Sequence, residues 1–338
     1  MDQIRLYDSH CHLSPDVTIN EYDELKKSLG NKEWPINLMM TNHIDRELIF
    51  KLMDEETIRN NKNVLLNVGI HPWFTHLYTN EKRNINEPEI EFKKRHYFSI
   101  LEKHSKNASD EIDKLIEQLP IPENLDDIIE IMEDKLKSNN NVNIGEIGID
   151  KVARIPNSGY LGNSSSISGL SNYRIKMSHQ LKIFKRQLNL IISVNRKKLS
   201  TSMHCVGAQG TMYECLKKFD GLIKEKQPDK VVNMAMHSYS GSIDNAKMLM
   251  KLSNVKVWFG ISEFVSLKFE KDSKRWLLLK ELLHIIRDCA LVETDFGVDR
   301  MKNEHKGNVL QIYTKLEELE VNDLNTSLYE NWCKFRQV

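Results

Sequence analysis

Short apolar runs alternate with longer amphipathic segments along the 338-residue chain. The runs are rich in β-branched residues and have the length of strands, whereas the segments between them repeat apolar residues at helical spacing. This alternation is typical of a parallel sheet with crossover helices. Eight runs qualify as strands, near residues 5–12, 36–42, 63–71, 141–149, 200–206, 231–238, 255–261 and 289–295. The pattern predicts a TIM-like (β/α)₈ barrel.

The predicted barrel spans residues 1–338 as a single domain, since α/β barrels commonly reach this length. The crossover after the third strand is too long for one helix, and we interpret residues 79–138 as an inserted helical region. Residues 156–172, rich in serine, are expected to form a loop after the fourth strand that is either a substrate loop or an ordinary surface loop. Residues 322–338 predict a terminal helix whose Trp332 and Phe335 pack against the barrel.

Composition limits the binding partners and the cellular compartment that we expect. The 48 basic and 48 acidic residues cancel, so no global positive field would hold the protein on DNA or on an anionic membrane. The five cysteines are widely spaced without a CxxC pair, which favours a reducing compartment. Neither a signal peptide nor a run of roughly 20 apolar residues is visible. We therefore expect a cytoplasmic or nuclear protein without a membrane segment.

Side chains that commonly bind metals stand near the ends of the predicted strands. His10 and His12 close the first strand, and two histidines on one face of a strand can reach one ion. Because strand side chains alternate between faces, Asp8 should share the face of these histidines. Ser9 and Cys11 should point the other way, which makes Cys11 a packing residue.

The later strands add further candidates. Glu146 follows an apolar run, and a buried carboxylate costs several kcal/mol unless it is paired or bound to a cation. His204 and His237 end the fifth and sixth strands; one such histidine is usually structural, but two favour a metal site. Asp150 is expected to orient a ligand or to cap its loop. Asp295 is predicted to bind an ion and to accept a proton from water, with a structural salt bridge as the alternative.

Taken in order, these motifs resemble the TatD-type metal-dependent deoxyribonucleases of the amidohydrolase superfamily. The resemblance spans essentially the whole chain, and the ordered set is more specific than any single motif. It rests on Asp8-Ser9-His10-Cys11-His12, Gly69-Ile70-His71-Pro72, Gly145-Glu146-Ile147-Gly148-Ile149-Asp150, His204-Cys205, His237-Ser238-Tyr239-Ser240-Gly241-Ser242 and Glu293-Thr294-Asp295.

The resemblance implies a hydrolase that cleaves phosphodiester bonds at DNA ends by two-metal water activation, with Asp295 as the base. A mixed histidine and carboxylate set suits Zn, Mg or Mn. His71 would lie near the substrate phosphate. Trp73, Phe74 and Tyr160, the last in the loop after the fourth strand, are candidates for base stacking. Two divalent ions would be held by six side chains, one ion by His10, His12 and Asp295, the other by His204 and His237, with Glu146 between them.

Two other functions stay open. Val206 and Phe296 stand where family members often carry an arginine and a proline. The arginine would contact a phosphate, so its absence, like the neutral net charge, would be natural for a small amide or ester hydrolase, which is the second function considered. The insertion and the loop containing Arg154, Tyr160 and Asn163 also resemble a divergent fungal branch described as binding a subunit of the anaphase-promoting complex. That likeness implies a non-nucleolytic interaction protein with a helical-repeat partner.

Overall fold

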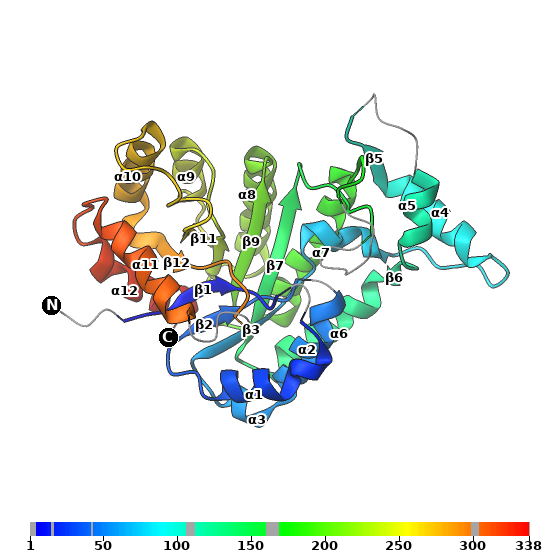
Figure 1. Ribbon diagram of the computed structural model, residues 1–338, viewed down its shortest axis with the longest axis horizontal. Helices are drawn as coiled ribbons and strands as arrows, with labels where there is room; N and C mark the ends of the chain where they lie inside the picture. The colour runs from blue at the N-terminus through cyan, green and yellow to red at the C-terminus, as the bar shows by residue number, and fades with distance from the viewer. Residues whose placement is uncertain are drawn as a thin grey trace.

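Eight parallel strands of the computed structural model form one sheet whose spatial order follows the chain. The structure describes residues 5–14, 17–41, 43–105, 112–159, 169–298 and 304–337. The predicted barrel is confirmed, with helices around a nearly closed sheet (Figure 1). Its strands, in order, are β1 (Asp8–Cys11), β2 (Ile36–Leu38), β3 (Val64–Val68), β7 (Val142–Asp150), β9 (Ser200–Val206), β10 (Val232–Met236), β11 (Val255–Ser262) and β12 (Ala290–Glu293).

Helices cover the outside of the sheet and bury apolar side chains against it. Sequence sets their ends: the side chain of Asn124 accepts the backbone N–H groups of Asp126 and Asp127, and lysines occupy the last turn of the same helix. The surrounding helices are α1 (Tyr22–Gly30), α2 (His43–Asp54), α3 (Glu56–Arg59), α6 (Leu125–Ser138), α7 (Met177–Val194), α8 (Gln209–Lys226), α9 (Ile243–Leu249), α10 (Lys274–Ile286), α11 (His305–Glu317) and α12 (Leu324–Arg336), with 3₁₀ turns η1 (Ile19–Glu21), η2 (Pro72–Leu77) and η3 (Arg287–Cys289).

A side lobe occupies most of the long crossover between β3 and β7 and projects from the barrel away from α11 and α12 (Figure 1). The lobe contains β4 (Tyr78–Thr79), α4 (Glu89–Ile100), β5 (Leu101–Lys103), α5 (Ile112–Gln118) and β6 (Glu123–Asn124). It pairs β5 antiparallel with β8 (Tyr173–Ile175), which follows β7 in the chain. A second apolar core joins the two segments and includes Tyr97, Ile116, Ile155 and Tyr173. The lobe and the described residues on both sides of this loop, Ile155 and Tyr173 among them, therefore share one apolar core.

The first and last strands of the sheet meet at a seam that closes the barrel. There the backbone N–H of Asp295 donates to the carbonyl of His10 over 2.9 Å, and the N–H of His12 donates to the carbonyl of Phe296 over 2.9 Å. The hydroxyl of Tyr7 accepts the N–H of Val292 at 3.0 Å. The seam thus brings the carboxyl ends of β1 and β12 together, and with them the residues that follow each strand.

The terminal helix α12 packs on the barrel through the residues that the sequence singled out. Trp332 and Phe335 are buried, and the indole of Trp332 stacks on the ring of Tyr7 with centroids 5.0 Å apart. The predicted packing role is confirmed. No helix among the described residues is both long and apolar enough to cross a membrane.

We predict that Trp332→Ala lowers the free energy of unfolding by about 3–5 kcal/mol, the usual cost of replacing a buried large aromatic by alanine. Urea denaturation of the purified protein measures the change. Glu330→Ala, an exposed position on the same helix, is the control and should cost less than about 0.5 kcal/mol. A loss below about 1 kcal/mol for Trp332→Ala would show that α12 does not depend on this contact.

Candidate metal centre

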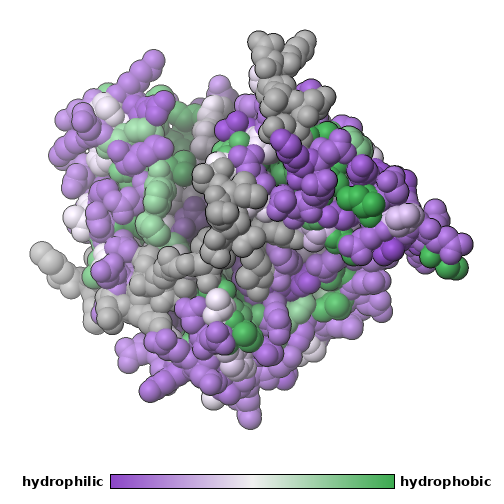
Figure 2. Space-filling model, turned by 45° about the vertical axis from the view of Figure 1, so that its right-hand side comes forward, coloured by the Kyte–Doolittle hydropathy of each residue, from purple (hydrophilic) through white to green (hydrophobic). Residues whose placement is uncertain are grey.

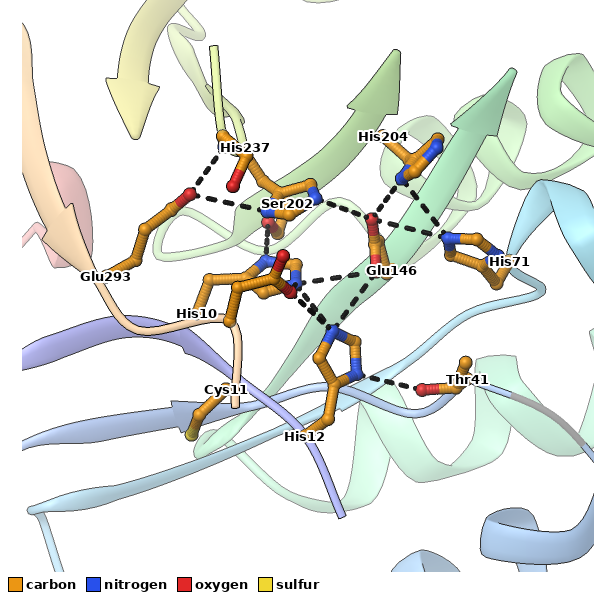
Figure 3. Close-up of polar contacts among 12 residues, drawn as sticks. His10, Cys11, His12, Thr41, His71, Glu146, Ser202, His204, His237 and Glu293 are labelled. Carbon is orange, nitrogen blue, oxygen red and sulfur yellow. Dashed lines mark hydrogen bonds and ion pairs between the residues drawn. The ribbon is translucent and has the colours of Figure 1, made fainter. Parts of the chain in front are cut away.

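The side chains predicted to bind metal come together at the carboxyl-terminal end of the barrel around Glu146 (Figure 3). In the view of Figure 3, Glu146 lies among imidazoles that come from several segments of the barrel. The cluster opens into a cavity of about 290 Å³, near the lower end of the range for small-ligand sites. The cavity is lined by His12, Thr41, Asp45, His71, Trp73, Glu146, His204, His237 and Asp295, among others.

The two carboxylate oxygens of Glu146 face two separate groups of imidazoles. Oε2 lies 3.4 Å from Nε2 of His10 and 3.4 Å from Nε2 of His12. Oε1 lies 2.9 Å from Nδ1 of His204 and 3.3 Å from Nε2 of His237. The glutamate itself is almost completely buried, with 1% of its surface exposed. One carboxylate therefore contacts both halves of the cluster.

Asp295 joins the half of the cluster that His10 and His12 form. Its Oδ1 lies 3.3 Å from Nε2 of His12 and 3.8 Å from Nε2 of His10. The ligand atoms of these three residues all lie within 4.8 Å of one another. Asp295 adopts a left-handed backbone conformation with φ of 61°, which aspartate tolerates better than most residues. The seam hydrogen bond from its N–H to His10 holds the backbone there.

The four histidines predicted to bind metal are His10, His12, His204 and His237. Each has a second polar side chain next to the ring nitrogen that does not face Glu146. Such contacts fix the orientation of an imidazole and raise its basicity as a ligand. The contacts are Nδ1 of His10 with Oγ of Ser202 at 2.7 Å, Nδ1 of His12 with Oγ1 of Thr41 at 2.9 Å, Nε2 of His204 with Oδ2 of Asp150 at 3.1 Å, and Nδ1 of His237 with Oε1 of Glu293 at 3.3 Å.

Asp150 performs both tasks considered for it from the sequence. While Oδ2 accepts from His204, Oδ1 accepts the N–H groups of Val152 at 2.8 Å and Ala153 at 2.9 Å. Sequence reasoning assigned no role to Glu293, whose buried carboxylate oxygen lies next to Nδ1 of His237. A second acidic residue at the end of the apolar run before Asp295 was the signal available for it.

The prediction that Asp8 shares the face of His10 and His12, while Ser9 points the other way, is wrong. The pairing register sets Asp8 against Ile36 and Cys11 against Leu38, so β1 contains one residue more than β2 over this stretch. This bulge breaks the alternation of faces. Ser9 therefore shares the inner side with His10 and donates to Glu293 at 3.4 Å.

Asp8, in contrast, does not join the metal cluster. Its carboxylate accepts from His305 of α11 and from Thr294. Cys11 is buried, as predicted for a packing residue.

Gly148 explains why β7 can lie so close to β9. A Cβ atom at this position would fall 2.0 Å from the carbonyl oxygen of His204, closer than any real contact. Its φ of 153° also lies outside the range that side chains usually adopt. Glycine at this position lets Glu146 and His204, on adjacent strands, reach each other.

The electrostatics of the cluster favour a bound cation. Burial by itself opposes ionisation of Glu146, yet the surrounding histidines, His71 and His237 first, hold its pKa well below the usual range. Burial also opposes protonation of His237, but Glu146 and Asp295 raise the pKa of that imidazole to about 10. The buried carboxylates thus draw positive charge into the site, and a metal ion would take the place of the proton on His237.

His71 also lies within the cluster, with Nε2 3.5 Å from Oε1 of Glu146 and 3.2 Å from Nδ1 of His204. Its Nδ1 accepts the backbone N–H of Trp73. Burial lowers the pKa of His71 to about 4, so the ring is neutral near pH 7 and carries its proton on Nε2. A neutral N–H donor suits contact with a substrate oxygen better than metal ligation.

Tyr160, the other predicted substrate contact, lies outside the described residues.

The donor set fits a divalent metal, because imidazole nitrogens and carboxylate oxygens are its usual ligands. A parallel barrel with such a cluster at the carboxyl ends of its strands defines a metal-dependent hydrolase. The chain belongs to the TatD family, since the model of the TatD related DNase family matches residues 7–336.

Two fungal relatives match nearly the whole chain. A Saccharomyces cerevisiae protein named "Uncharacterized deoxyribonuclease YMR262W" is 27% identical over 348 residues, covering 98% of this chain and 99% of the relative. The "Cut9-interacting protein scn1" of Schizosaccharomyces pombe is 31% identical over 355 residues, with the same coverage of 98% and 99%.

A solved structure shares the fold. The crystal structure of YJJV, a TatD homologue from Escherichia coli, superposes with a TM-score of 0.53 and covers 99% of both chains. Its sequence identity with this chain is 15%.

We predict that Glu146→Gln, which keeps the size and removes the charge, empties at least one metal position and leaves the fold intact. Elemental analysis of protein reconstituted with Mn²⁺ and dialysed measures the loss, and circular dichroism checks the fold. Glu47→Gln on the exposed face of α2 makes the same chemical change away from the site and should retain the parent's metal content. Equal metal content in Glu146→Gln and the parent would make Glu146 a structural residue.

Proposed function

We propose that this TatD-family hydrolase is a deoxyribonuclease that cleaves phosphodiester bonds at DNA ends and uses two divalent ions, with Zn, Mg and Mn as the candidates. One observation carries the proposal: the two carboxylate oxygens of Glu146 face two different groups of histidines. A single ion would need only one of the two groups. The family to which the chain belongs supports DNA as the substrate.

In this proposal His10, His12 and Asp295 would hold the first ion, His204 and His237 would hold the second, and Glu146 would contribute to both positions. When bound, such a pair acidifies water and polarises the phosphoryl group. The outer hydrogen bonds of the histidines keep their ligand nitrogens turned toward Glu146.

Asp295 is proposed to accept the proton of the attacking water. Burial alone would raise its pKa, but the neighbouring His237 and the hydrogen bond from His12 hold the pKa well below its usual range. The carboxylate is therefore ionised at neutral pH, as a base must be, and its side chain is 27% exposed and lines the cavity. His71 is proposed to donate its Nε2–H to a phosphate oxygen.

The test compares Asp295→Asn with the parent protein in hydrolysis of a single-stranded DNA oligonucleotide, with and without added Mg²⁺, Mn²⁺ or Zn²⁺. We expect metal-dependent cleavage by the parent and a turnover that is about 10²- to 10⁴-fold lower in the variant, which removes general-base assistance. Asp229→Asn, at the opposite end of the barrel before β10, is the matched control and should retain full activity.

Each outcome has a consequence. Parent-like cleavage by Asp295→Asn would move the role of base to another group, with His71 tested next. A parent without hydrolysis under any of the three metals would overturn the nuclease proposal and leave partner binding as the function.

Partner binding is the second candidate, favoured by the similarity to a relative named as a Cut9-interacting protein. The side lobe adds apolar side chains exposed at Ile85, Ile90 and Phe98 on a largely hydrophilic surface (Figure 2). We propose that the lobe is the surface that contacts a helical-repeat protein. Apolar side chains exposed on one lobe suit such a contact, because interface cores are apolar and depleted in charge.

We predict that Phe98→Asp weakens binding to a purified helical-repeat partner at least tenfold, while Glu146→Gln binds like the parent. Isothermal titration calorimetry gives both affinities, and DNA hydrolysis by Phe98→Asp checks that the barrel stays intact. Weakened binding in Glu146→Gln with unchanged binding in Phe98→Asp would move the interface from the lobe to the metal centre.

A further inference from the structure

One aromatic side chain at the mouth of the cavity is held in a way that packing alone does not explain. Trp73 lies on η2, directly after the His71-Pro72 pair, and lines the cavity together with His71 and His204. Its side chain is 38% exposed, whereas Trp258, Trp276 and Trp332 are buried in the core. A large apolar ring exposed beside a reaction site is a candidate for contact with substrate.

The indole is fixed in place by the metal centre itself. Its Nε1–H donates to Oδ2 of Asp150 over 2.7 Å, and the same oxygen accepts from Nε2 of His204. The ring stands edge-to-face against His71 at 4.8 Å and His204 at 5.8 Å between centroids. Trp73 is therefore preorganised, so a ligand that stacks on it loses little free energy to ordering the side chain.

We propose that Trp73 is the platform of a nucleobase subsite next to the scissile phosphate, an inference that rests on the proposed nuclease function. Figure 3 shows His71 and His204 on the same side of Glu146, so the indole that packs on both adjoins that half of the cluster. A phosphate contacted by His71 would set the base of the adjacent nucleotide over the ring. Base pairing would keep that base in a duplex, so the subsite takes an unpaired nucleotide.

The hydrogen bond to Asp150 gives the subsite a second role. Asp150 orients His204, a proposed metal ligand, and its other oxygen caps the loop after β7. A base stacked on Trp73 would therefore reinforce the position of a ligand to the second ion. Substrates that carry a base at this site are expected to be cleaved faster than equally charged substrates without one.

The experiment compares kcat/KM for a single-stranded oligonucleotide with that for the same oligonucleotide carrying abasic tetrahydrofuran residues at its terminal positions. The parent is expected to prefer the base-bearing substrate by about 5- to 150-fold, the range that corresponds to base–aromatic stacking of about 1–3 kcal/mol. Trp73→Ala should bring this ratio close to 1, mainly because the KM for the base-bearing substrate rises. Trp73→Phe, which keeps a ring and loses the N–H, should retain most of the preference.

The ratio separates stacking from structural damage, because damage to the metal centre lowers the rates on both substrates alike. Leu277→Ala, which removes an exposed apolar side chain from α10, is the control and should leave the ratio unchanged. An unchanged preference in Trp73→Ala would overturn the subsite while hydrolysis by the parent upheld the nuclease. A parent that cleaves both substrates equally would also overturn it. A parent that cleaves neither substrate would contradict the nuclease function on which the subsite rests.

Discussion

The site is organised around one buried carboxylate. Glu146 lies on the longest strand of the barrel with 1% of its surface exposed, and a buried charge of this kind costs several kcal/mol without compensation. The compensation comes from imidazoles that lie on both sides of the carboxylate. Those imidazoles in turn need their own partners, which Ser202, Thr41 and Asp150 supply. The buried polar groups at this end of the barrel therefore form successive shells around the carboxylate of Glu146.

Barrel closure and assembly of the metal centre depend on the same contacts. His10 lies on the first strand, His12 directly follows that strand and Asp295 follows the last, so these three residues meet only if β1 and β12 meet. Asp8 reinforces that junction from outside the cluster. Its carboxylate accepts the N–H of His10 and both the N–H and the hydroxyl of Thr294, and His305 donates to it from α11 over 2.7 Å.

Much of this arrangement could be predicted from the sequence, because the fold obeys simple periodicity. Each of the eight expected strands exists, and residues at the ends of parallel strands necessarily gather at one end of the barrel. The pattern did not reveal the bulge in β1, since the extra residue is defined only by the pairing with β2. Alternation therefore assigned Asp8 to the wrong side.

Contacts between segments far apart in the sequence could not be predicted either. The carboxylate of Glu293 next to His237 and the indole of Trp73 on Asp150 depend on which strands become neighbours and how far each extends. The second apolar core of the side lobe joins segments more than fifty residues apart, such as Tyr97 and Tyr173. Periodicity within one segment carries no information about such pairings.

The central claim is that Glu146 holds two ions at once, and anomalous diffraction from crystals grown with Mn²⁺ tests it most directly. The account predicts two anomalous peaks on opposite sides of the Glu146 carboxylate, one in contact with His10, His12 and Asp295 and the other with His204 and His237. A single peak at saturating Mn²⁺, or two peaks of which neither contacts Glu146, would contradict it.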